Sequence, residues 1–472
     1  MVLAKSLTVD TNKIEFQSTV NSAGVTVTAN VDTWTITSAD ASWITLSQVS
    51  GNSGTTLVNI SVSENTSSAV RSAVITIKSS QAASVQVNLT QLGVLPVVAT
   101  ELYPSYNTNP IAADASGMSS TAVQLAAKIN LGWNIGNTLE ATGGETAWGN
   151  PKVTKALIDL VKQSGFNAIR IPCSWNQNLA NTGTAQIKTE WLNRVKEVVQ
   201  YCVDNDMYVI VNIHWDGGWL ENNCTEAQKE ANNAKQKAFW EQIATQLRGF
   251  DEHLLFASTN EPNVDNSTQM AVLTSYHQTF IDAVRATGGK NANRTLIVQG
   301  PATDIEKTNK LMLTLPTDKV ANRMMVEVHY YTPYNFCLMD KDANWGKMFY
   351  YWGVNYHSTT DLTRNPTYGE EADLDNLFKS MKTQFVDKGI PVVLGEFGAI
   401  RRTSLTGDAL TLHLASRAYY LKYVVKQAKI NGMLPFYWDA GGMADNGSAI
   451  FNRTNNTVFD TQALTGLLDG LK

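Results

Sequence analysis

Residues 254–262 read Leu-Leu-Phe-Ala-Ser-Thr-Asn-Glu-Pro and pass from an apolar run directly into polar and acidic side chains. A short continuous apolar run is typical of a β-strand that is buried on both faces. Asn260 and Glu261, in contrast, are residue types that a protein interior seldom holds without partners. The stretch therefore predicts a buried strand that ends in chemically useful groups, and the same pattern recurs along the chain.

Eight such apolar runs occur between residues 131 and 438, and segments with helical spacing follow most of them. Two of these helices would close at Gly165 and Gly432, because Gly adopts the left-handed conformation of a helix end without steric cost. The predicted strands are Leu131–Ile135, Ala168–Cys173, Tyr208–His214, Leu254–Ser258, Leu296–Gln299, Met324–His329, Val392–Glu396 and Leu434–Trp438.

Eight strands alternating with helices over roughly 350 residues predict an α/β fold, and specifically a (β/α)8 TIM barrel. A doubly wound parallel sheet is the alternative. That fold would place a glycine-rich phosphate loop after its first strand, and Gly132-Trp-Asn-Ile-Gly136 does not have that composition. We therefore expect the barrel.

Two acids stand at predicted strand ends, which is where a TIM barrel carries its catalytic groups. Glu261 follows the fourth strand and Glu396 ends the seventh, so the two carboxyl groups would face each other across the barrel mouth. Cleavage of a glycosidic bond needs such a pair, because one acid protonates the leaving oxygen while one carboxylate attacks the anomeric carbon.

The other strand ends contribute Arg170, His214, His329 and Trp438. Each has an ordinary interpretation by itself: an arginine in a salt bridge, histidines in the core, or a tryptophan that caps the barrel. The run Asn260-Glu-Pro262 would likewise suit the start of a helix. Their joint occurrence in the right chain order favours an active site.

Residues 1–93 differ in composition from the rest of the chain, since they contain no Pro, Cys or His and are rich in Ser and Thr. Apolar residues alternate with polar ones in four runs that Ser, Gly and Asn clusters separate, which predicts a small all-β sandwich of the immunoglobulin type. The alternating runs are Val25, Val27 and Ala29; Val58, Ile60 and Val62; Ala73, Ile75 and Ile77; and Val85, Val87 and Leu89.

The segment 94–118 has no clear period and carries Pro96, Pro104 and Pro110. It is predicted to be a linker that is partly packed on the unit that follows. The expected organisation is therefore a sandwich at residues 1–93, a linker at 94–118 and a catalytic barrel at 119–472.

The overall composition excludes some function classes. The 472 residues carry a formal net charge of −5 and are 43% hydrophobic and 17% charged, which is globular composition without the basic excess that nucleic acid binding requires. No stretch approaches 18 consecutive apolar residues, so we expect no membrane-spanning segment. Met1–Lys5 is too short to be an export signal.

Residues 131–472 resemble glycoside hydrolase family 5, and in particular its subfamily 4 of endoglucanases and xyloglucanases. Residues 5–93 are similar to the BACON module, which often precedes such enzymes in anaerobic gut bacteria. His214 is followed by Trp215, where many members of the subfamily carry a second His. The stretches behind the family 5 resemblance are Gly132-Trp-Asn-Ile-Gly-Asn-Thr-Leu139, Ile169-Arg-Ile-Pro172, Asn260-Glu-Pro262, His329-Tyr-Tyr331, Gly395-Glu-Phe-Gly398 and Tyr437-Trp-Asp439, and those behind the BACON resemblance are Trp43-Ile-Thr-Leu-Ser47 and Val87-Asn-Leu-Thr-Gln91.

The resemblance implies a retaining mechanism in which Glu396 is the nucleophile and Glu261 the acid/base. Arg170 and the Tyr331 hydroxyl would stabilise the negative charge of Glu396. That charge would in turn raise the pKa of Glu261. Further supporting roles fall to Asn260 at the sugar 2-hydroxyl, His214 and His329 as orienting groups, Trp438 as a platform for the sugar ring, and Asn137.

No metal or other cofactor is expected. Four cysteines, at 173, 202, 224 and 337, show no CxxC pairing, and no His pair stands at i, i+4. Cys173 and Cys202 fall in a predicted strand and helix and are expected to be buried free thiols. A disulfide between Cys224 and Cys337 is left open.

The expected substrate is a neutral plant polysaccharide. The loop between Phe336 and Tyr368 is rich in aromatic residues, which either form a satellite core or line an extended cleft for several sugar rings. We selected Trp352 and Trp219 as candidates for sugar stacking. The resemblance points to β-1,4-glucan and favours xyloglucan, with a β-mannanase or a non-catalytic carbohydrate-binding barrel as alternatives.

Because polysaccharides do not enter cells, we expect a protein that is secreted or attached to the cell surface, and it is expected to be a monomer. The sandwich itself is not expected to bind glycans. Its aromatic residues are Phe16, Trp34 and Trp43; Trp34 shares a face with Ile36 and should be core, which leaves Trp43 as the candidate for exposure.

Overall fold

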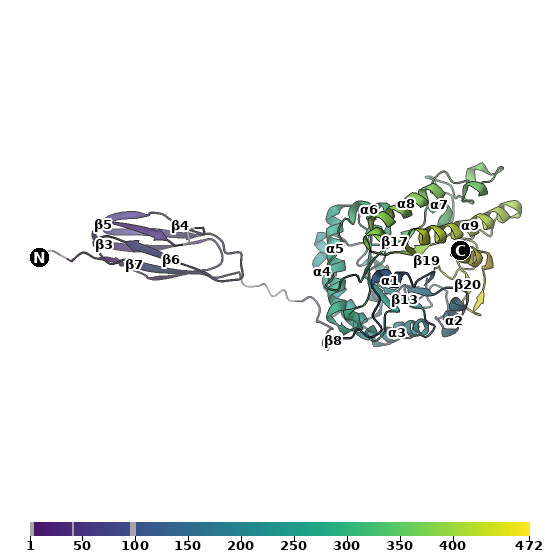
Figure 1. Cartoon of the computed structure of the whole chain (residues 1–472), viewed down its shortest axis with the longest axis horizontal. Coiled ribbons are helices and arrows are strands. Elements are labelled where there is room, and N and C mark those ends of the chain that lie inside the picture. The colour runs from purple at the N-terminus through teal and green to yellow at the C-terminus, as the bar shows by residue number, and fades with distance from the viewer. Residues whose placement is uncertain (1–3, 40–41, 95–100) are drawn as a thin grey trace. The chain divides into compact units, whose positions relative to one another are not determined.

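The computed structural model describes residues 4–39, 42–94 and 101–472 of the chain. The protein consists of two compact units, Met1–Thr100 and Glu101–Lys472. The first is built of strands, and the second combines strands and helices (Figure 1).

The first unit is a seven-stranded sheet in the order β2-β7-β6-β3-β5-β4, with β1 paired to β3. The predicted alternation is present, since Val58 and Ile60 are fully buried while Asn59 between them is exposed. The all-β prediction is therefore confirmed. The strands are β1 (Leu7–Val9), β2 (Lys13–Phe16), β3 (Asn21–Ser38), β4 (Ile44–Leu46), β5 (Ser50–Val62), β6 (Arg71–Lys78) and β7 (Val85–Gln91).

The aromatic residues of the first unit are mostly enclosed. Phe16 and Trp34 are buried, as expected for Trp34, whose indole N–H donates to the carbonyl of Asn52 at 3.2 Å. Trp43 is only half-buried, but the guanidinium of Arg71 lies 4.5 Å from the centre of its ring. Trp43, the candidate for exposure, is thus partly exposed, and Arg71 lies over its ring in a cation–π contact.

Residues 95–100 of the expected linker lie outside the described residues, and the part from Glu101 onward packs along the barrel. The buried carboxylate of Glu241 accepts the backbone N–H of Tyr106 at 2.6 Å and that of Asn107 at 3.2 Å. Strand β8 (Ile111–Ala113) then pairs with β15 (Gly288–Gly289).

The barrel itself is a closed ring of eight parallel strands, in the order β10-β13-β14-β16-β17-β18-β19-β9. All eight begin within one residue of the runs predicted from the sequence, and six also end within one residue; β10 and β13 end two residues earlier than predicted. The predicted TIM barrel is confirmed. The strands are β9 (Gly132–Ile135), β10 (Ala168–Ile171), β13 (Tyr208–Asn212), β14 (Leu254–Ala257), β16 (Leu296–Gln299), β17 (Met324–Tyr330), β18 (Val392–Phe397) and β19 (Met433–Asp439).

A helix follows every barrel strand, and the helices surround the strands (Figure 1). Gly165 and Gly432 have positive φ and stand directly after the ends of α2 and α9, as predicted. The short helix α1 (Ala122–Ala126) places Leu125 in a core cluster with inward barrel residues such as Ile210. The outer helices are α2 (Lys155–Gln163), α3 (Thr189–Val203), α4 (Glu226–Leu247), α5 (Ser267–Ala286), α6 (Ile305–Leu311), α8 (Glu371–Gln384), α9 (Gly407–Ile430) and α10 (Thr461–Asp469).

Strand β18 contains one extra residue relative to β17, because Val328 pairs with Leu394 and His329 pairs with Glu396. This bulge leaves Gly395 unpaired. A Cβ atom on Gly395 would lie 2.0 Å from Oε1 of the buried Glu327, so both Gly395 and Glu396 face the barrel interior. A bulge re-aims side chains in this way because it interrupts the normal alternation.

The remaining elements are short and lie in the loops. Over the described ranges, no helix combines the length and apolar character that a membrane crossing requires. The short elements are β11 (Leu179–Asn181), β12 (Gln186–Ile187), β20 (Phe451–Asn452), β21 (Thr457–Val458), α7 (Tyr334–Cys337), and the 3₁₀ turns η1 (Asn176–Asn178), η2 (Asp216–Gly218), η3 (Lys290–Ala292), η4 (Pro301–Thr303), η5 (Val354–Tyr356), η6 (Leu362–Arg364) and η7 (Val386–Lys388).

Candidate active site

Arg170, at the end of β10, is fully buried and organises the barrel mouth. Its Nη1 donates to Oε1 of Glu396 at 2.8 Å and to Oδ1 of Asn134 at 3.0 Å, and its Nη2 donates to Oδ1 of Asn260 at 2.8 Å. Its Nε forms an ion pair with Glu327 at 2.9 Å. A guanidinium whose charge is matched by carboxylates fixes the orientation of every group that it contacts.

Glu396 is buried and is held from two sides. Arg170 contacts one carboxylate oxygen, and the Tyr331 hydroxyl donates to the other at 3.0 Å. Burial raises the pKa of Glu396 above its usual value, although the charges of His329 and Arg170 and the bond from Tyr331 oppose that rise. The two contacts therefore fix the orientation of the Glu396 carboxylate, while burial makes its ionisation harder than in water.

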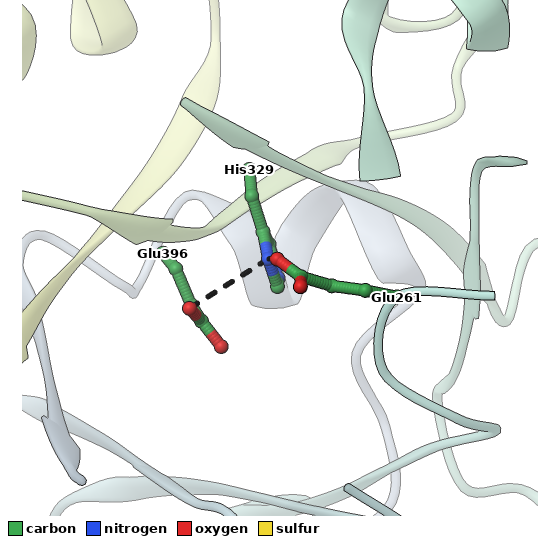
Figure 2. Close-up of side chains that lie close together, drawn as sticks. All are labelled: Glu261, His329 and Glu396. Atoms are coloured by element: carbon green, nitrogen blue, oxygen red, sulfur yellow. Dashed lines mark hydrogen bonds and ion pairs between the residues drawn. The ribbon is translucent and has the colours of Figure 1, made fainter. Parts of the chain in front are cut away.

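His329 joins the two acids (Figure 2). Its Nδ1 lies 2.7 Å from Oε1 of Glu261 and 3.7 Å from Oε2 of Glu396, and its Nε2 lies 3.1 Å from Oε1 of Glu327. Although burial disfavours a charged imidazole, these carboxylates raise the pKa of His329 to about 10. The surrounding carboxylates therefore favour the imidazolium form of His329.

Glu261 lies directly after β14 and its side chain is 44% exposed. Burial raises its pKa, but the hydrogen bond and charge of His329, together with the charge of Arg170, outweigh burial and hold the pKa below its usual value. We expected the charge of Glu396 to raise the pKa of Glu261. The net shift of the pKa of Glu261 is in the opposite direction, because the hydrogen bond and charge of His329 act on Glu261 more strongly.

One oxygen of Glu261, one of Glu396 and a ring nitrogen of His329 all lie within 4.8 Å of one another. Three such atoms would also suit a divalent cation. In the structure, however, Nδ1 of His329 lies 2.7 Å from Oε1 of Glu261, and Nε2 lies 3.1 Å from Oε1 of Glu327. These short contacts suit proton transfer between the imidazole and the carboxyl groups.

A cavity of about 370 Å³ opens beside these groups. Trp438, Tyr331, Asn137 and Trp148 contribute to its lining. Trp438, in β19, is partly exposed, and its ring lies nearly parallel to that of His214, with 5.8 Å between ring centres and 7° between planes. The cavity therefore has an apolar wall, and it adjoins Tyr331, which contacts Glu396.

A family model described as cellulase, glycosyl hydrolase family 5, matches residues 81–444. The chain belongs to glycoside hydrolase family 5. A second family model, BACON, which describes a candidate N-terminal binding domain, matches residues 14–92. The resemblances drawn from the sequence motifs are thus confirmed, and the protein is a glycoside hydrolase.

Several characterised family 5 proteins are similar over most of their length. A xyloglucan-specific endo-β-1,4-glucanase of Bacteroides ovatus is 36% identical over 93% of this chain and 86% of its own. The endoglucanase A of Paenibacillus barcinonensis is 36% identical over 79% of this chain and 96% of its own. A crystallised Bacteroides ovatus xyloglucanase, in complex with a XXXG heptasaccharide, has a TM-score of 0.72 and 34% identity over 99% of this chain and 100% of that one.

Most residues that the sequence predicted for the site meet at the mouth of this family 5 barrel. Trp219 and Trp352 are not among them. Trp352 is fully buried among Tyr419, Tyr420 and Tyr423 and donates its indole N–H to the carbonyl of Gly369 at 2.8 Å. The prediction that Trp352 stacks on sugar is wrong, because neither face of its ring is accessible. The residues that meet are Arg170, His214, Asn260, Glu261, His329, Tyr331, Glu396, Trp438 and Asn137.

Trp219 is half-buried in the loop after β13. Its indole N–H donates to Asp216 at 3.1 Å, one ring edge packs on Phe239, and Lys235 lies 4.9 Å from the ring centre. Its role in sugar binding stays a prediction.

The four cysteines are all buried free thiols, so Cys173 and Cys202 are as predicted. The disulfide left open for Cys224 and Cys337 is not formed. The Cys224 thiol lies 3.8 Å from the carbonyl of Leu220, and the Cys337 thiol donates to the Tyr420 hydroxyl at 3.3 Å.

The sequence reasoning missed Glu327. This carboxylate is fully buried in β17, where it pairs with Arg170 and His329 and accepts the side-chain amide of Gln299 at 2.6 Å. Its signal was present, because Glu327 and His329 are two residues apart in one strand and must share a face. Glu221, in the loop after β13, was also missed.

Proposed function

We propose that this family 5 hydrolase is a retaining endo-β-1,4-glucanase that works by double displacement. The observation that carries the proposal is the separation of the two acids, whose nearest ligand oxygens lie within 4.8 Å of each other. Retaining glycosidases place their carboxyl groups about 5–5.5 Å apart, whereas inverting enzymes need about 6.5–9.5 Å to admit a water molecule.

In the first step, a carboxylate oxygen of Glu396 attacks the anomeric carbon, and the bond from that carbon to the leaving sugar oxygen breaks. Glu261 gives its proton to this oxygen. In the second step Glu261 takes a proton from water, the oxygen of which displaces Glu396. Two inversions restore the original configuration. Arg170 and Tyr331 hold Glu396 in line for attack.

The proton for the first step belongs to the Glu261–His329 pair. In the resting site the imidazolium holds it, because the pKa of His329 is raised and that of Glu261 is lowered. The hydrogen bond of 2.7 Å between them gives a direct path for its transfer. The pair therefore titrates as a unit, and Glu261 becomes the acid when sugar enters and weakens the pairing.

The groups around the acids would fix the sugar ring. Asn260 is anchored by Arg170 through its carbonyl oxygen, so its amide N–H groups remain to contact the 2-hydroxyl, a contact that strengthens in the transition state. Trp438 offers an apolar face to the ring, and His214 packs on that indole. Asn137 lines the adjoining cavity.

A polymeric substrate is supported by exposed tryptophans in the loops that follow the carboxyl ends of the strands. Trp148, Trp215 and Trp345 lie in the loops after β9, β13 and β17 and are 46%, 46% and 68% exposed. Exposed indoles can stack on successive sugar rings. Together with the xyloglucan-specific relatives, they favour xyloglucan or a related β-1,4-glucan, cut at internal bonds. An enzyme that acts on such polymers works outside the cell, so we propose a secreted or surface-attached monomer.

Two measurements test this function. A panel of soluble xyloglucan, mixed-linkage glucan, carboxymethyl cellulose and mannan should show fastest release of reducing ends from xyloglucan, with a steep early drop in viscosity. Preference for mannan would replace the substrate assignment, and no turnover on any polymer would leave a binding protein. Early proton NMR should detect the β-anomer first, and an initial α-anomer would exclude double displacement.

A further inference from the structure

Glu221 lies in the loop between β13 and α4 and is 4% exposed. Its Oε1 accepts the backbone N–H of Glu261 at 2.7 Å, and its backbone carbonyl accepts the N–H of Asn263 at 2.8 Å. One residue therefore holds the main chain on both sides of Pro262, in the segment that presents the acid/base.

The side chain of Asn260 lies near Glu221 and favours its ionised form. Arg170 donates to Oδ1 of Asn260 at 2.8 Å, and an amide nitrogen carries two hydrogens. The N–H groups of Asn260 therefore remain to contact a sugar hydroxyl.

We propose that Glu221 is a positioning residue of the hydrolytic reaction: it sets the main chain of Glu261 for catalysis, and its negative charge opposes the ionisation of the acid/base. The inference rests on the proposed function, since it assigns Glu261 as the acid. Glu221 does not itself contact the substrate in this scheme; it acts through the segment 261–263, which it holds at Glu261 and Asn263.

The charge of Glu221 matters because the ionisable groups that face it are acidic. They are the carboxyl groups of Glu261 and Glu396 and the thiol of Cys224. Burial, followed by the charge of Glu261, raises the pKa of Glu221 to about 7, although the N–H of Glu261 and the amide of Asn260 oppose that rise. When Glu221 is ionised it repels a second negative charge, and this repulsion favours the protonated form of Glu261.

The variant Glu221→Gln separates this role from simple loop packing. The glutamine keeps one oxygen for the N–H of Glu261, but it carries no charge, so the bond to that N–H is no longer charge-assisted. We expect kcat on xyloglucan to fall by at least about tenfold, the scale of losing one hydrogen bond to a charged group. The alkaline limb of kcat/KM should move to lower pH by about half a unit or more.

A matched control is Glu145→Gln, which neutralises another buried carboxylate that accepts a backbone N–H, that of Val153 at 2.8 Å. Glu145 pairs with Arg194 and touches none of the site residues named above. Glu145→Gln should lower the melting temperature and leave the alkaline limb of kcat/KM in place.

Two outcomes for a folded Glu221→Gln variant would overturn the proposal. One is a wild-type kcat with a wild-type alkaline limb, and the other is a lower kcat with an alkaline limb that does not move.

The variant Glu221→Asp keeps the test decisive if the glutamine variant does not fold. Aspartate retains the charge but is one methylene too short to reach the N–H of Glu261, so kcat should fall while the alkaline limb stays near its wild-type position. An unchanged kcat would refute positioning. The dependence of kcat and kcat/KM on pH can also be measured with an aryl β-cellobioside, a substrate that does not depend on the choice of polymer. An error in the assigned polysaccharide is therefore distinguishable from an error in the role of Glu221.

Discussion

The ionisation of the site is governed by an imbalance of charge. Four carboxyl groups lie near two cations, so the cations cannot neutralise all of them. Burial raises the pKa of Glu221 and Glu396, whereas Glu327 is fully buried but pairs with both cations, which hold its pKa below the usual value. The cation that lies between the acids holds a proton far above neutral pH. The carboxyl groups are those of Glu221, Glu261, Glu327 and Glu396, and the cations are Arg170 and His329.

Replacement of the two catalytic acids should have different consequences. Glu396→Gln removes the nucleophile, so turnover should be lost on every substrate. Glu261→Gln removes only proton transfer, which an acidic phenol leaving group does not need. With 2,4-dinitrophenyl β-cellobioside, stopped-flow absorbance should show a burst of phenolate for Glu261→Gln. Wild-type activity in Glu396→Gln would refute the assignment of the nucleophile.

The acid limb of the pH profile should lie above the ordinary glutamate value of 4.5, because Glu396 must be ionised to attack and burial raises its pKa. As pH falls through this raised pKa, the fraction of active enzyme is lost. Tyr331→Phe removes a bond that lowers the pKa of Glu396, so the limb should move to still higher pH. Measurement of kcat/KM against pH for both proteins checks this; a limb at or below 4.5, or a downward shift in the variant, would contradict it.

The arrangement of the elements explains why the acids meet. The bulge at Gly395 turns Glu396 toward the barrel interior, beside the inward-facing Glu327 and His329 of β17. A side chain at Gly395 would overlap Glu327, so the glycine makes room for a buried carboxylate. In the motif Gly395-Glu-Phe-Gly398, Gly395 is therefore needed for the backbone to pass close to Glu327, and Glu396 supplies the chemistry.

The long loop after β17 contains two tryptophans with opposite expected roles. Trp352→Ala removes a buried ring and should lower the free energy of unfolding by about 3–5 kcal/mol, with no loss of oligosaccharide affinity by the folded protein. Trp345→Ala removes a ring that is 68% exposed, and should weaken binding by about 1–3 kcal/mol at unchanged stability. Calorimetric titration and thermal melts of both variants test this pair, and an exchange of the two effects would show that the roles are reversed.

The sequence predicted the strands well because a doubly buried parallel strand is one continuous apolar run with polar residues at its end, as in 254–262. It predicted the loops poorly, since aromatic composition does not show which way a ring points. Trp352 and Trp345 are alike in sequence and opposite in exposure. The pKa of Glu261 was expected to move the wrong way, because the effect of His329 depends on a contact of 2.7 Å.

The molecule as a whole combines a catalytic unit with a sandwich that has its own core. The sandwich cluster is built from residues 7–89, including Phe16 and Trp34. Its remaining aromatic ring, Trp43, is covered by Arg71. A flat platform of exposed rings, which extended glycans generally need, is thus not present among the described residues of this unit.

The isolated residues 1–93 should therefore show no retardation in affinity electrophoresis through xyloglucan, glucan or mannan gels. The full chain carrying Glu396→Gln is the matched control, because its intact cleft should be retarded in a xyloglucan gel. Removal of the sandwich should leave the rate on soluble substrate within about twofold, as expected for domains with separate cores. Retardation of residues 1–93 that disappears in Trp43→Ala would show that the ring is available after all.

The strap of chain that runs from Glu101 to Met118 limits where this enzyme can be joined to foreign modules. A fusion that begins at residue 119 would deprive the buried Glu241 of the N–H donors of Tyr106 and Asn107. Each donor removed from a buried group costs about 1–3 kcal/mol, and more where the group is charged. A fusion joint placed ahead of Glu101 avoids that cost, so chimaeric hydrolases should exchange their leading modules at that point and carry the strap along with the barrel.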